Sequence, residues 1–326
     1  MNRYAWIDMH CDSLLRAYRQ EPGSLWDGEG HQNLKKMGES GQMAQFFAVF
    51  FPPRPSASDG AEADPEQMPD DTAYFLKLRS ILMDQVALHS DTVRFAQGPE
   101  EIRKHAARGI ASAVLSVEDG RMIDNDLKRI AWLRDMGVRA IGLTWNHANC
   151  LGFPNSADAA ENQRGLTPFG REAVREMNRL GILVDVSHLS DGGFDDVAKI
   201  SQKPFVATHS DARAVTNHPR NLSDQMLKKL ADKGGVTGLN FVPEFLNEKQ
   251  LPGAVSMLMA HARHIVQVAG EDALGIGSDF DGFEEPSEIG GSTQMHLLFE
   301  AMEKEFTPRQ MDKFTSGNVL RVLGDQ

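Results

Sequence analysis

Short apolar runs alternate with helical stretches along the whole chain, and this alternation predicts the fold. Eight runs have the length and composition of buried strands: Tyr4–Met9, Met43–Phe50, Ala111–Val117, Val138–Thr144, Ile182–Ser187, Pro204–Thr208, Val236–Phe241 and Leu274–Ser278. Repeated strand–helix units favour a parallel sheet, and eight of them favour an α/β fold of the (β/α)8 TIM-barrel type. A doubly wound open sheet is the alternative. No glycine-rich phosphate motif follows the first run, which counts mildly against that alternative.

Several of the intervening helices have recognisable ends. Thr167 stands directly before a proline and predicts a helix start, and Gly181 predicts the end of that helix. Ser223 and Gly234 frame a second helix in the same way, and Gly137 ends a third. These boundaries lie between the predicted strands, as a regular strand–helix repeat requires.

One segment, residues 51–71, breaks this rhythm because it is rich in Pro, Ser, Ala and acidic residues. We interpret it as a solvated loop. The alternative is a flap over the mouth of the barrel, since the segment follows the second predicted strand at the end where barrel enzymes carry their active sites. The sequence contains no internal repeat, and we predict one domain that spans residues 1–326.

Composition and charge limit the classes of function. Of the 326 residues, 41% are hydrophobic and 25% are charged, as in an ordinary globular protein. The net charge of −12 argues against nucleic acid or an anionic membrane as a partner. Two cysteines, Cys11 and Cys150, are too few for a protein held together by disulfides. With no signal-peptide pattern before the first motif and no membrane-length apolar run, we predict a cytoplasmic protein.

Histidines and acidic residues gather where the predicted strands end. These residues are His10, Asp12, Glu118, His147, His188, His209 and Asp279. In a barrel the carboxyl ends of the strands converge on one mouth, and His, Asp and Glu are the zinc ligands of sites without thiolate. A single such residue is more simply a helix cap or a satisfied polar group, but together they predict a metal centre. We interpret His261, His264 and Cys11 as structural.

Motifs in this order and at these separations carry a resemblance to a known family. They are "HCD" from His10, "VEDG" around Glu118, "LTWNHAN" around His147, "VDVSHLS" around His188, "THSDARAVTNHPRN" from His209, "GIGSDFDG" around Asp279 and "GNVLRV" from Gly317. Nearly the whole chain resembles the renal (membrane) dipeptidases, which are binuclear zinc peptidases of the amidohydrolase-like superfamily. The resemblance implies a single metallo-dependent hydrolase barrel.

The resemblance also implies a metal content of two Zn²⁺ per chain. One ion would be held by His10, Asp12 and Glu118, and the other by Glu118, His188 and His209. Glu118 and a hydroxide would bridge the two ions, and this hydroxide would attack the peptide carbonyl.

Further roles follow from the same resemblance. Asp279 would transfer the proton to the leaving amine, with Asp281 as the rival for that role. His147 would stabilise the tetrahedral oxyanion and contact substrate. Arg220 would bind the C-terminal carboxylate of a dipeptide. Without the resemblance, Arg220 would be interpreted as a surface arginine paired with a nearby acid such as Asp224.

The resulting prediction is a zinc-dependent metallodipeptidase that hydrolyses small dipeptides, with neither nucleic acid nor membrane as a partner. A homodimer is the family-level expectation. One alternative is a binuclear amidohydrolase that acts on N-acyl amino acids or cyclic amides, and another is an inactive barrel that serves as a binding module. The preferred side chains, the acceptance of D-residues and the hydrolysis of β-lactams stay open.

Overall fold

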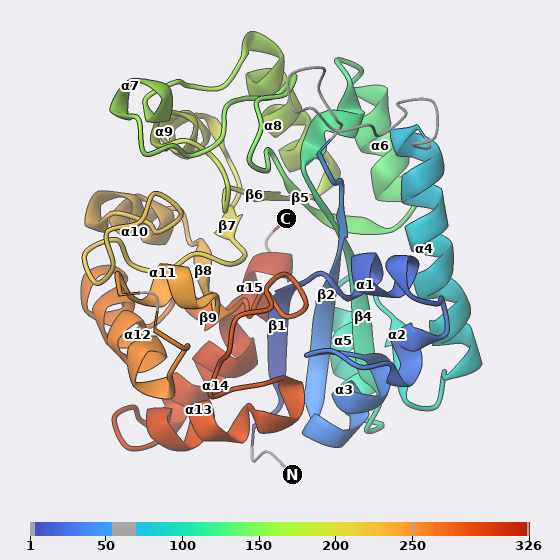
Figure 1. The fold of residues 1–326 in the computed structure, drawn as a ribbon. Coiled ribbons are helices and arrows are strands. Elements are labelled where there is room, and N and C mark those ends of the chain that lie inside the picture. The colour runs from blue at the N-terminus through green and yellow to red at the C-terminus, as the bar shows by residue number, and fades with distance from the viewer. Residues whose placement is uncertain (1–3, 54–69, 250, 325) are drawn as a thin grey trace.

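A closed parallel barrel forms the centre of the molecule (Figure 1). The computed structural model describes residues 4–53, 70–249, 251–324 and 326. The strands are β1 (Trp6–Cys11), β2 (Gln42–Phe50), β3 (Val93–Phe95), β4 (Ala111–Glu118), β5 (Val138–Gly142), β6 (Leu183–Asp185), β7 (Val206–Ala207), β8 (Val236–Leu239) and β9 (Leu274–Ile276). All of their pairings are parallel, and β2 pairs with β4 to close the ring. The predicted (β/α)8 barrel is therefore confirmed.

The structure adds one short strand, β3, that the hydrophobic pattern did not predict. β3 pairs with Ala111–Ala113 at the start of β4, and β5 pairs further along β4 with residues 115–117. Because β2 occupies one edge of β4, the strands β3 and β5 share the other edge. Three residues with an arginine in the middle give too short an apolar run to be recognised in the sequence.

The strand boundaries differ from the predicted ones mainly at the carboxyl ends. Five strands are shorter than predicted: β5, β6, β7, β8 and β9. For example, the run predicted over residues 204–208 contributes only Val206–Ala207 to the ladder. In contrast, β1 begins two residues later than predicted and extends to Cys11. Where strands stop early, their apolar continuation leaves the sheet and becomes the loops that carry the polar residues.

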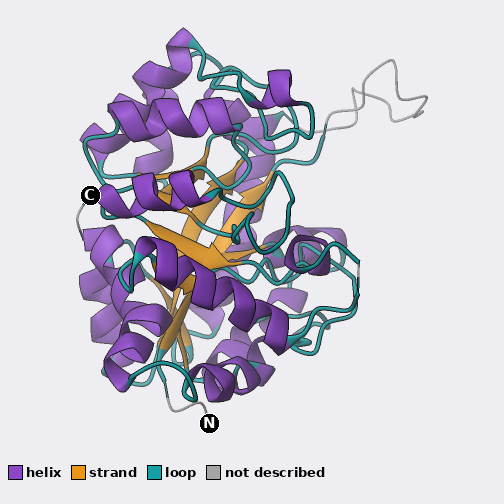
Figure 2. Ribbon diagram, turned by 90° about the vertical axis from the view of Figure 1, so that its left-hand side faces the viewer, coloured by secondary structure: helices purple, strands orange, loops and turns teal. Residues whose placement is uncertain are grey.

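Helices surround the strands on all sides (Figure 2). They are α1 (Ser13–Arg19), α2 (Ser24–Asp27), α3 (Leu34–Ser40), α4 (Asp71–Leu88), α5 (Pro99–Ala106), α6 (Lys128–Asp135), α7 (Ala159–Asn162), α8 (Pro168–Leu180), α9 (Asp191–Ile200), α10 (Asp224–Asp232), α11 (Pro243–Leu246), α12 (Val255–Ala269), α13 (His296–Met302), α14 (Pro308–Asp312) and α15 (Asn318–Gly324). Within the described residues, no helix is both long enough and apolar enough to cross a membrane.

The predicted helix ends are found in the structure. The Thr167 side chain accepts a hydrogen bond from the amide of Gly170 and caps α8, and Gly181 ends that helix with φ of 69°. The Ser223 side chain caps α10 in the same way, and Gly234 follows its last turn with φ of 70°. A left-handed conformation of this kind favours glycine because it has no Cβ to clash with the backbone.

Two apolar layers hold the barrel together. One layer lies inside the barrel, where Ile7, Val206 and Val236 from the first halves of their strands pack with Val319 and Leu320 of α15. The other fills the space between strands and helices and includes the fully buried Cys11, as predicted for a packing residue. Because α15 packs against the amino-terminal half of the interior, the carboxyl ends of the strands are left to line the mouth.

The segment predicted as a loop or flap, residues 51–71, lies mostly outside the described residues. Its two ends are described, and Arg121 joins them. The Arg121 guanidinium donates to the carbonyl oxygen of Pro52 at 2.9 Å and to both carboxylate oxygens of Asp71 at 3.1 and 3.2 Å. Arg121 follows shortly after the last residue of β4, so both ends of the segment are fixed beside the mouth of the barrel.

Candidate metal centre

Five of the residues predicted from strand ends meet at the mouth of the barrel. His10 lies in β1, and Glu118 is the last residue of β4. His188, His209 and Asp279 lie two or three residues beyond the last residues of β6, β7 and β9. Each of these residues is less than a tenth exposed. Residues far apart in the sequence therefore come together because parallel strands of a barrel end on the same side.

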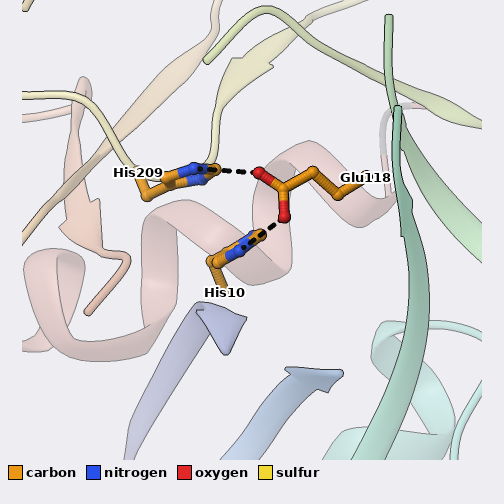
Figure 3. A group of neighbouring side chains, drawn as sticks. All are labelled: His10, Glu118 and His209. Carbon is orange, nitrogen blue, oxygen red and sulfur yellow. Dashed lines mark ion pairs between the residues drawn. The ribbon is translucent and has the colours of Figure 1, made fainter. Parts of the chain in front are cut away.

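Glu118 is at the centre of this group, and its two carboxylate oxygens face different histidines (Figure 3). Oε2 lies 3.3 Å from Nε2 of His10. Oε1 lies 2.8 Å from Nε2 of His188 and 3.6 Å from Nε2 of His209. One carboxylate is thus placed to serve two groups of ligands, one on each side.

Two further carboxylates lie on the His10 side of the centre. Asp12 Oδ2 is 3.5 Å from Nε2 of His10, and Asp279 Oδ1 is 3.9 Å from the same atom. The backbone of Gly282 lies against both acids, and a Cβ there would collide with Asp279 and come within 2.6 Å of Asp12 Oδ2. Glycine at this position lets the loop after β9 close over the carboxylates.

The donor atoms of these residues fit metal ions. Nε2 of His10 and Oδ1 of Asp12 are buried and have no hydrogen-bond partner among the described residues, and burying such groups unsatisfied is costly. The Nε2 atoms of His188 and His209 lie only 3.1 Å apart. Ligand atoms of His10, Glu118 and His209 lie within 4.8 Å of one another, as do those of His10, Asp12 and Asp279. Imidazole nitrogen and carboxylate oxygen without thiolate are a donor set typical of zinc.

The electrostatics of the centre leave two histidines neutral. Burial lowers the pKa of His188 and of His209 well below the ordinary value, and the positive charge of Arg220 and of His10 lowers each pKa further. Burial would also lower the pKa of His10, but the facing carboxylates of Glu118 and Asp12 outweigh it and raise that pKa. A neutral imidazole is the form that binds a metal, so His188 and His209 are in the ligating form at neutral pH.

The pKa values of two carboxylates of the centre are shifted upward, in the opposite direction to those of His188 and His209. Burial raises the pKa of Glu118 to about 7, although the neighbouring His10 lowers it in part. Burial also raises the pKa of Asp279. A buried carboxyl group with a raised pKa can exchange a proton near neutral pH, which is the property that general acid–base catalysis requires.

Asp279 and its predicted rival Asp281 occupy different surroundings. Asp279 accepts one hydrogen bond, from the Asn240 amide at 3.0 Å, and its other oxygen faces His10. The two carboxylate oxygens of Asp281 are instead held by donors on the segment from α1 to the loop before α3. These donors are Ser13 Oγ, Arg16 Nε and the backbone amide of His31.

Arg220 is not the surface residue that its sequence context alone indicated. Its side chain is only 5% exposed, and Asp224 pairs with His264 instead, at 2.7 Å. The Arg220 guanidinium donates to the carbonyl oxygens of Ser187 and His209. Ser187 directly precedes His188, and His209 is itself part of the candidate metal centre. Its Nε is buried and has no hydrogen-bond partner among the described residues.

A cavity of about 630 Å³ opens onto Glu118, His188 and Asp279. Its apolar walls include Phe50, Trp145, Phe245 and Phe283. The Arg220 guanidinium lies 5.3 Å from the ring centre of Phe245, but Arg220 does not itself line the cavity. His147 lies on the loop after β5, where it is exposed, and its ring centre is 5.7 Å from that of Trp145.

Comparisons with known proteins identify the family of this chain. The profile of the family described as "Membrane dipeptidase (Peptidase family M19)" matches residues 1–326. The chain belongs to this family. Among curated M19-like sequences, Dipeptidase tcpJ of Claviceps purpurea is 29% identical over 97% of this chain and 76% of its own length.

Solved structures of M19 enzymes have the same fold. The crystal structure of dipeptidase AC, a metallopeptidase of family M19, is 31% identical, covers 98% of both chains and has a TM-score of 0.87. A metallopeptidase from Rhodobacter sphaeroides, solved with a phosphinate mimic of the dipeptide L-Ala-D-Ala, is 33% identical and has a TM-score of 0.88. It covers 98% of this chain and 99% of its own. This chain is therefore an M19 metallodipeptidase in family and fold.

Several residues that contact the candidate metal centre were not singled out from the sequence. Asn146 Oδ1 lies 3.0 Å from Nδ1 of His188, and Thr208 Oγ1 lies 2.8 Å from Nδ1 of His209. Asp185 accepts hydrogen bonds from Thr208. Asp185 could have been noticed, because a buried acid inside an otherwise apolar run needs partners. Nothing in the local pattern distinguishes Thr208 from an ordinary strand threonine.

Proposed function

We propose that this protein is a zinc-dependent dipeptidase with two metal ions per chain. Support comes chiefly from Glu118, whose two oxygens face His10 on one side and His188 with His209 on the other. His10, Asp12 and Glu118 would hold one ion, and Glu118, His188 and His209 the other. Nε2 of His10 and Oδ1 of Asp12, which are buried without a hydrogen bond among the described residues, favour the same assignment.

Two zinc ions in this position would activate a water shared between them and polarise the peptide carbonyl. The protein's own residues would handle the proton and the substrate. Asp279 would take the proton of the attacking water and return it to the leaving amine. The raised pKa of Asp279 suits this exchange, and the hydrogen bond from Asn240 holds the carboxylate toward the centre.

Arg220 would bind the C-terminal carboxylate of the dipeptide. The terminal nitrogens of the buried guanidinium donate to backbone carbonyls, but its Nε has no hydrogen-bond partner among the described residues and could donate to a substrate anion. The ring of Phe245, which lines the cavity, lies 5.3 Å from the guanidinium. His147 would approach the oxyanion from the rim beside Trp145. The relative from Rhodobacter sphaeroides carries a mimic of L-Ala-D-Ala, so we extend the proposal to dipeptides with a D-residue at the C-terminal position.

The location and the assembly of the protein stay predictions of the sequence. A cytoplasmic location rests on the low cysteine count, and a homodimer rests on the family. The interpretation of residues 1–326 as a single domain likewise stays a prediction.

The central experiment compares a free dipeptide with the same dipeptide amidated at its C-terminus. The wild-type enzyme should prefer the free form strongly. Arg220→Ala should raise KM for the free form by about ten- to a hundredfold, since charge-assisted hydrogen bonds contribute about 1.5–3 kcal/mol, and should erase the preference. Arg220→Lys should not restore it, because an ammonium cannot form the two-pronged contact.

Arg179→Ala is the matched control, because this arginine is exposed on α8 and pairs only with Glu176 among the described residues. It should behave as wild type. Chelation should abolish activity, and added zinc should restore it. Equal hydrolysis of both substrates by the wild type would contradict a dipeptidase, and preference for N-acetyl amino acids or cyclic amides would indicate the amidohydrolase alternative. Near-zero zinc with no turnover would indicate the inactive barrel.

A further inference from the structure

A buried hydrogen-bond chain stands behind His209, on the side away from Glu118. Thr208 Oγ1 lies 2.8 Å from Nδ1 of His209 and 2.6 Å from Oδ2 of Asp185. Asp185 ends β6, and Thr208 directly follows β7. Thr208 is 2% exposed and Asp185 is 6% exposed, so water does not compete for these contacts. The proposed mechanism gives neither residue a role.

The direction of this chain is fixed by the carboxylate. Oδ1 of Asp185 accepts from the amides of Ser187 and Thr208 and from Ser187 Oγ, and Oδ2 accepts from Thr208 Oγ1. A carboxylate can only accept, so the single hydroxyl proton of Thr208 points at Asp185. Ser187 Oγ also lies 3.1 Å from Thr208 Oγ1, but its proton is already donated to Asp185.

The tautomer of His209 follows from this direction. Because the Thr208 hydroxyl has used its proton, its oxygen can only accept from Nδ1 of His209. Nδ1 therefore carries the ring proton, and the lone pair of Nε2 faces Glu118. The same holds for His188, whose Nδ1 lies 3.0 Å from the amide oxygen of Asn146, although Asn146 is exposed. Two Nε2 lone pairs then face each other across 3.1 Å, an arrangement that a cation would stabilise.

We propose that Asp185 and Thr208 are positioning residues that hold His209 in the Nδ1–H tautomer and so set the metal affinity of the Glu118–His188–His209 group. The inference rests on the proposed metal centre, but not on the identity of the substrate. Partners that orient ligating histidines in this way typically change metal affinity by about ten- to a hundredfold when they are removed.

The first test removes the hydroxyl while preserving the shape of the side chain. Thr208→Val should weaken zinc binding about ten- to a hundredfold, measured on metal-free protein by competition with a chromophoric chelator. Thr208→Ser keeps the hydroxyl and should restore most of that affinity. Thr315→Val is the control, because this equally buried threonine donates to the Met311 carbonyl and not to a residue of the candidate centre. It should bind zinc as the wild type does.

The sharper test reverses the direction of the hydrogen bonds from Asp185 through Thr208 to His209. In Asp185→Asn, the two backbone amides at Oδ1 keep the amide oxygen in place, so the new NH2 group faces Thr208. The Thr208 hydroxyl must then accept from it and donate its own proton to Nδ1 of His209. His209 would shift to the Nε2–H tautomer, which cannot bind a metal through Nε2. Asp185→Asn should therefore lose more affinity than Thr208→Val.

The tautomer of His209 can also be measured directly in metal-free protein. In metal-free wild-type protein labelled with ¹⁵N-histidine, NMR should show His209 protonated at Nδ1, and in Asp185→Asn at Nε2. An Nε2–H tautomer in the wild type would overturn the inference even if the variants failed to fold. Wild-type zinc affinity in Thr208→Val would overturn it too, with the proposed function intact. If the wild type itself bound no zinc, the proposed function would fail, and the inference about metal affinity would fail with it.

Discussion

At the scale of single residues, surroundings separate two acids that are equivalent in the sequence. Asp279 and Asp281 both follow β9 and both adopt positive φ, 63° and 66°, which aspartate tolerates better than most residues. The turn sends the two side chains in different directions. Asp281 is held by three donors and fixes a neighbouring loop, whereas Asp279 keeps one oxygen directed at the centre.

We predict that Asp279→Asn lowers kcat by at least about a hundredfold, the usual scale for general acid–base catalysis, while zinc content stays at the wild-type level. The amide retains the size of the carboxylate but cannot exchange the proton. Asp281→Asn is the matched comparison. It should keep most of kcat and lower thermal stability, because it weakens the contacts to Arg16 and His31. Metal analysis and steady-state kinetics measure both effects. If Asp281→Asn lost kcat and Asp279→Asn kept it, the proton-transfer role would belong to Asp281.

Sequence reasoning located the candidate ligands because their positions depend on a simple geometric rule. A polar residue at the end of a barrel strand must face the mouth, wherever it stands in the chain. The position of Arg220 obeys no such rule. Its burial depends on backbone carbonyls of Ser187 and His209, which belong to other loops, so local context suggested a surface ion pair with Asp224. The roles of Thr208 and Asn146 were missed for the same reason.

At the scale of elements, the eight predicted apolar runs correspond to the eight strands of the barrel, but their lengths do not agree. Periodicity and composition report burial, and residues beyond β7 such as Thr208 stay buried after they leave the ladder. An apolar run therefore overestimates a short barrel strand. Helix ends were predicted more accurately, because a cap is a local contact between neighbours in the sequence. Thr167 and Gly181, for example, frame α8 as predicted.

The cap of α8 gives a test at this scale. Thr167 Oγ1 accepts from the Gly170 amide at 2.9 Å and donates to the Cys150 carbonyl at 2.6 Å, which joins the helix to the loop after β5. Thr167→Ala should lower the free energy of unfolding by about 1–2 kcal/mol in urea denaturation. Thr167→Ser keeps both contacts and should lose much less. Because α8 packs on the outside of the barrel, zinc content should not change, and an unchanged urea midpoint in Thr167→Ala would refute the importance of the cap.

At the scale of the whole molecule, the metal centre links stability to pH. Burial raises the pKa of Glu118 to about 7, so the metal-free folded protein retains a proton there that the unfolded chain, with its ordinary pKa of 4.5, has lost. This contribution to stability is present at low pH and disappears as the pH rises through 7. Burial lowers the pKa of His188 and of His209. This shift affects stability in the opposite direction, because it makes the folded protein more stable as the pH rises. That opposing gain continues through the ordinary histidine pKa of 6.5, where half of the unfolded-state imidazoles are still protonated, and it is nearly complete about one pH unit higher.

Between about pH 6.5 and 8, the loss from Glu118 and the gain from His188 and His209 are of similar size, and His10, whose pKa is also raised, shifts the balance toward loss. We predict that metal-free protein loses on the order of 1 kcal/mol of unfolding free energy over this range. Zinc-loaded protein should not, because metal binding replaces the protons and requires the ligands without them. Urea denaturation with and without zinc measures the difference. Glu118→Gln, which has no proton to lose, should flatten the metal-free slope. Rising stability of metal-free wild type over this range would contradict the retention of protons by Glu118 and His10.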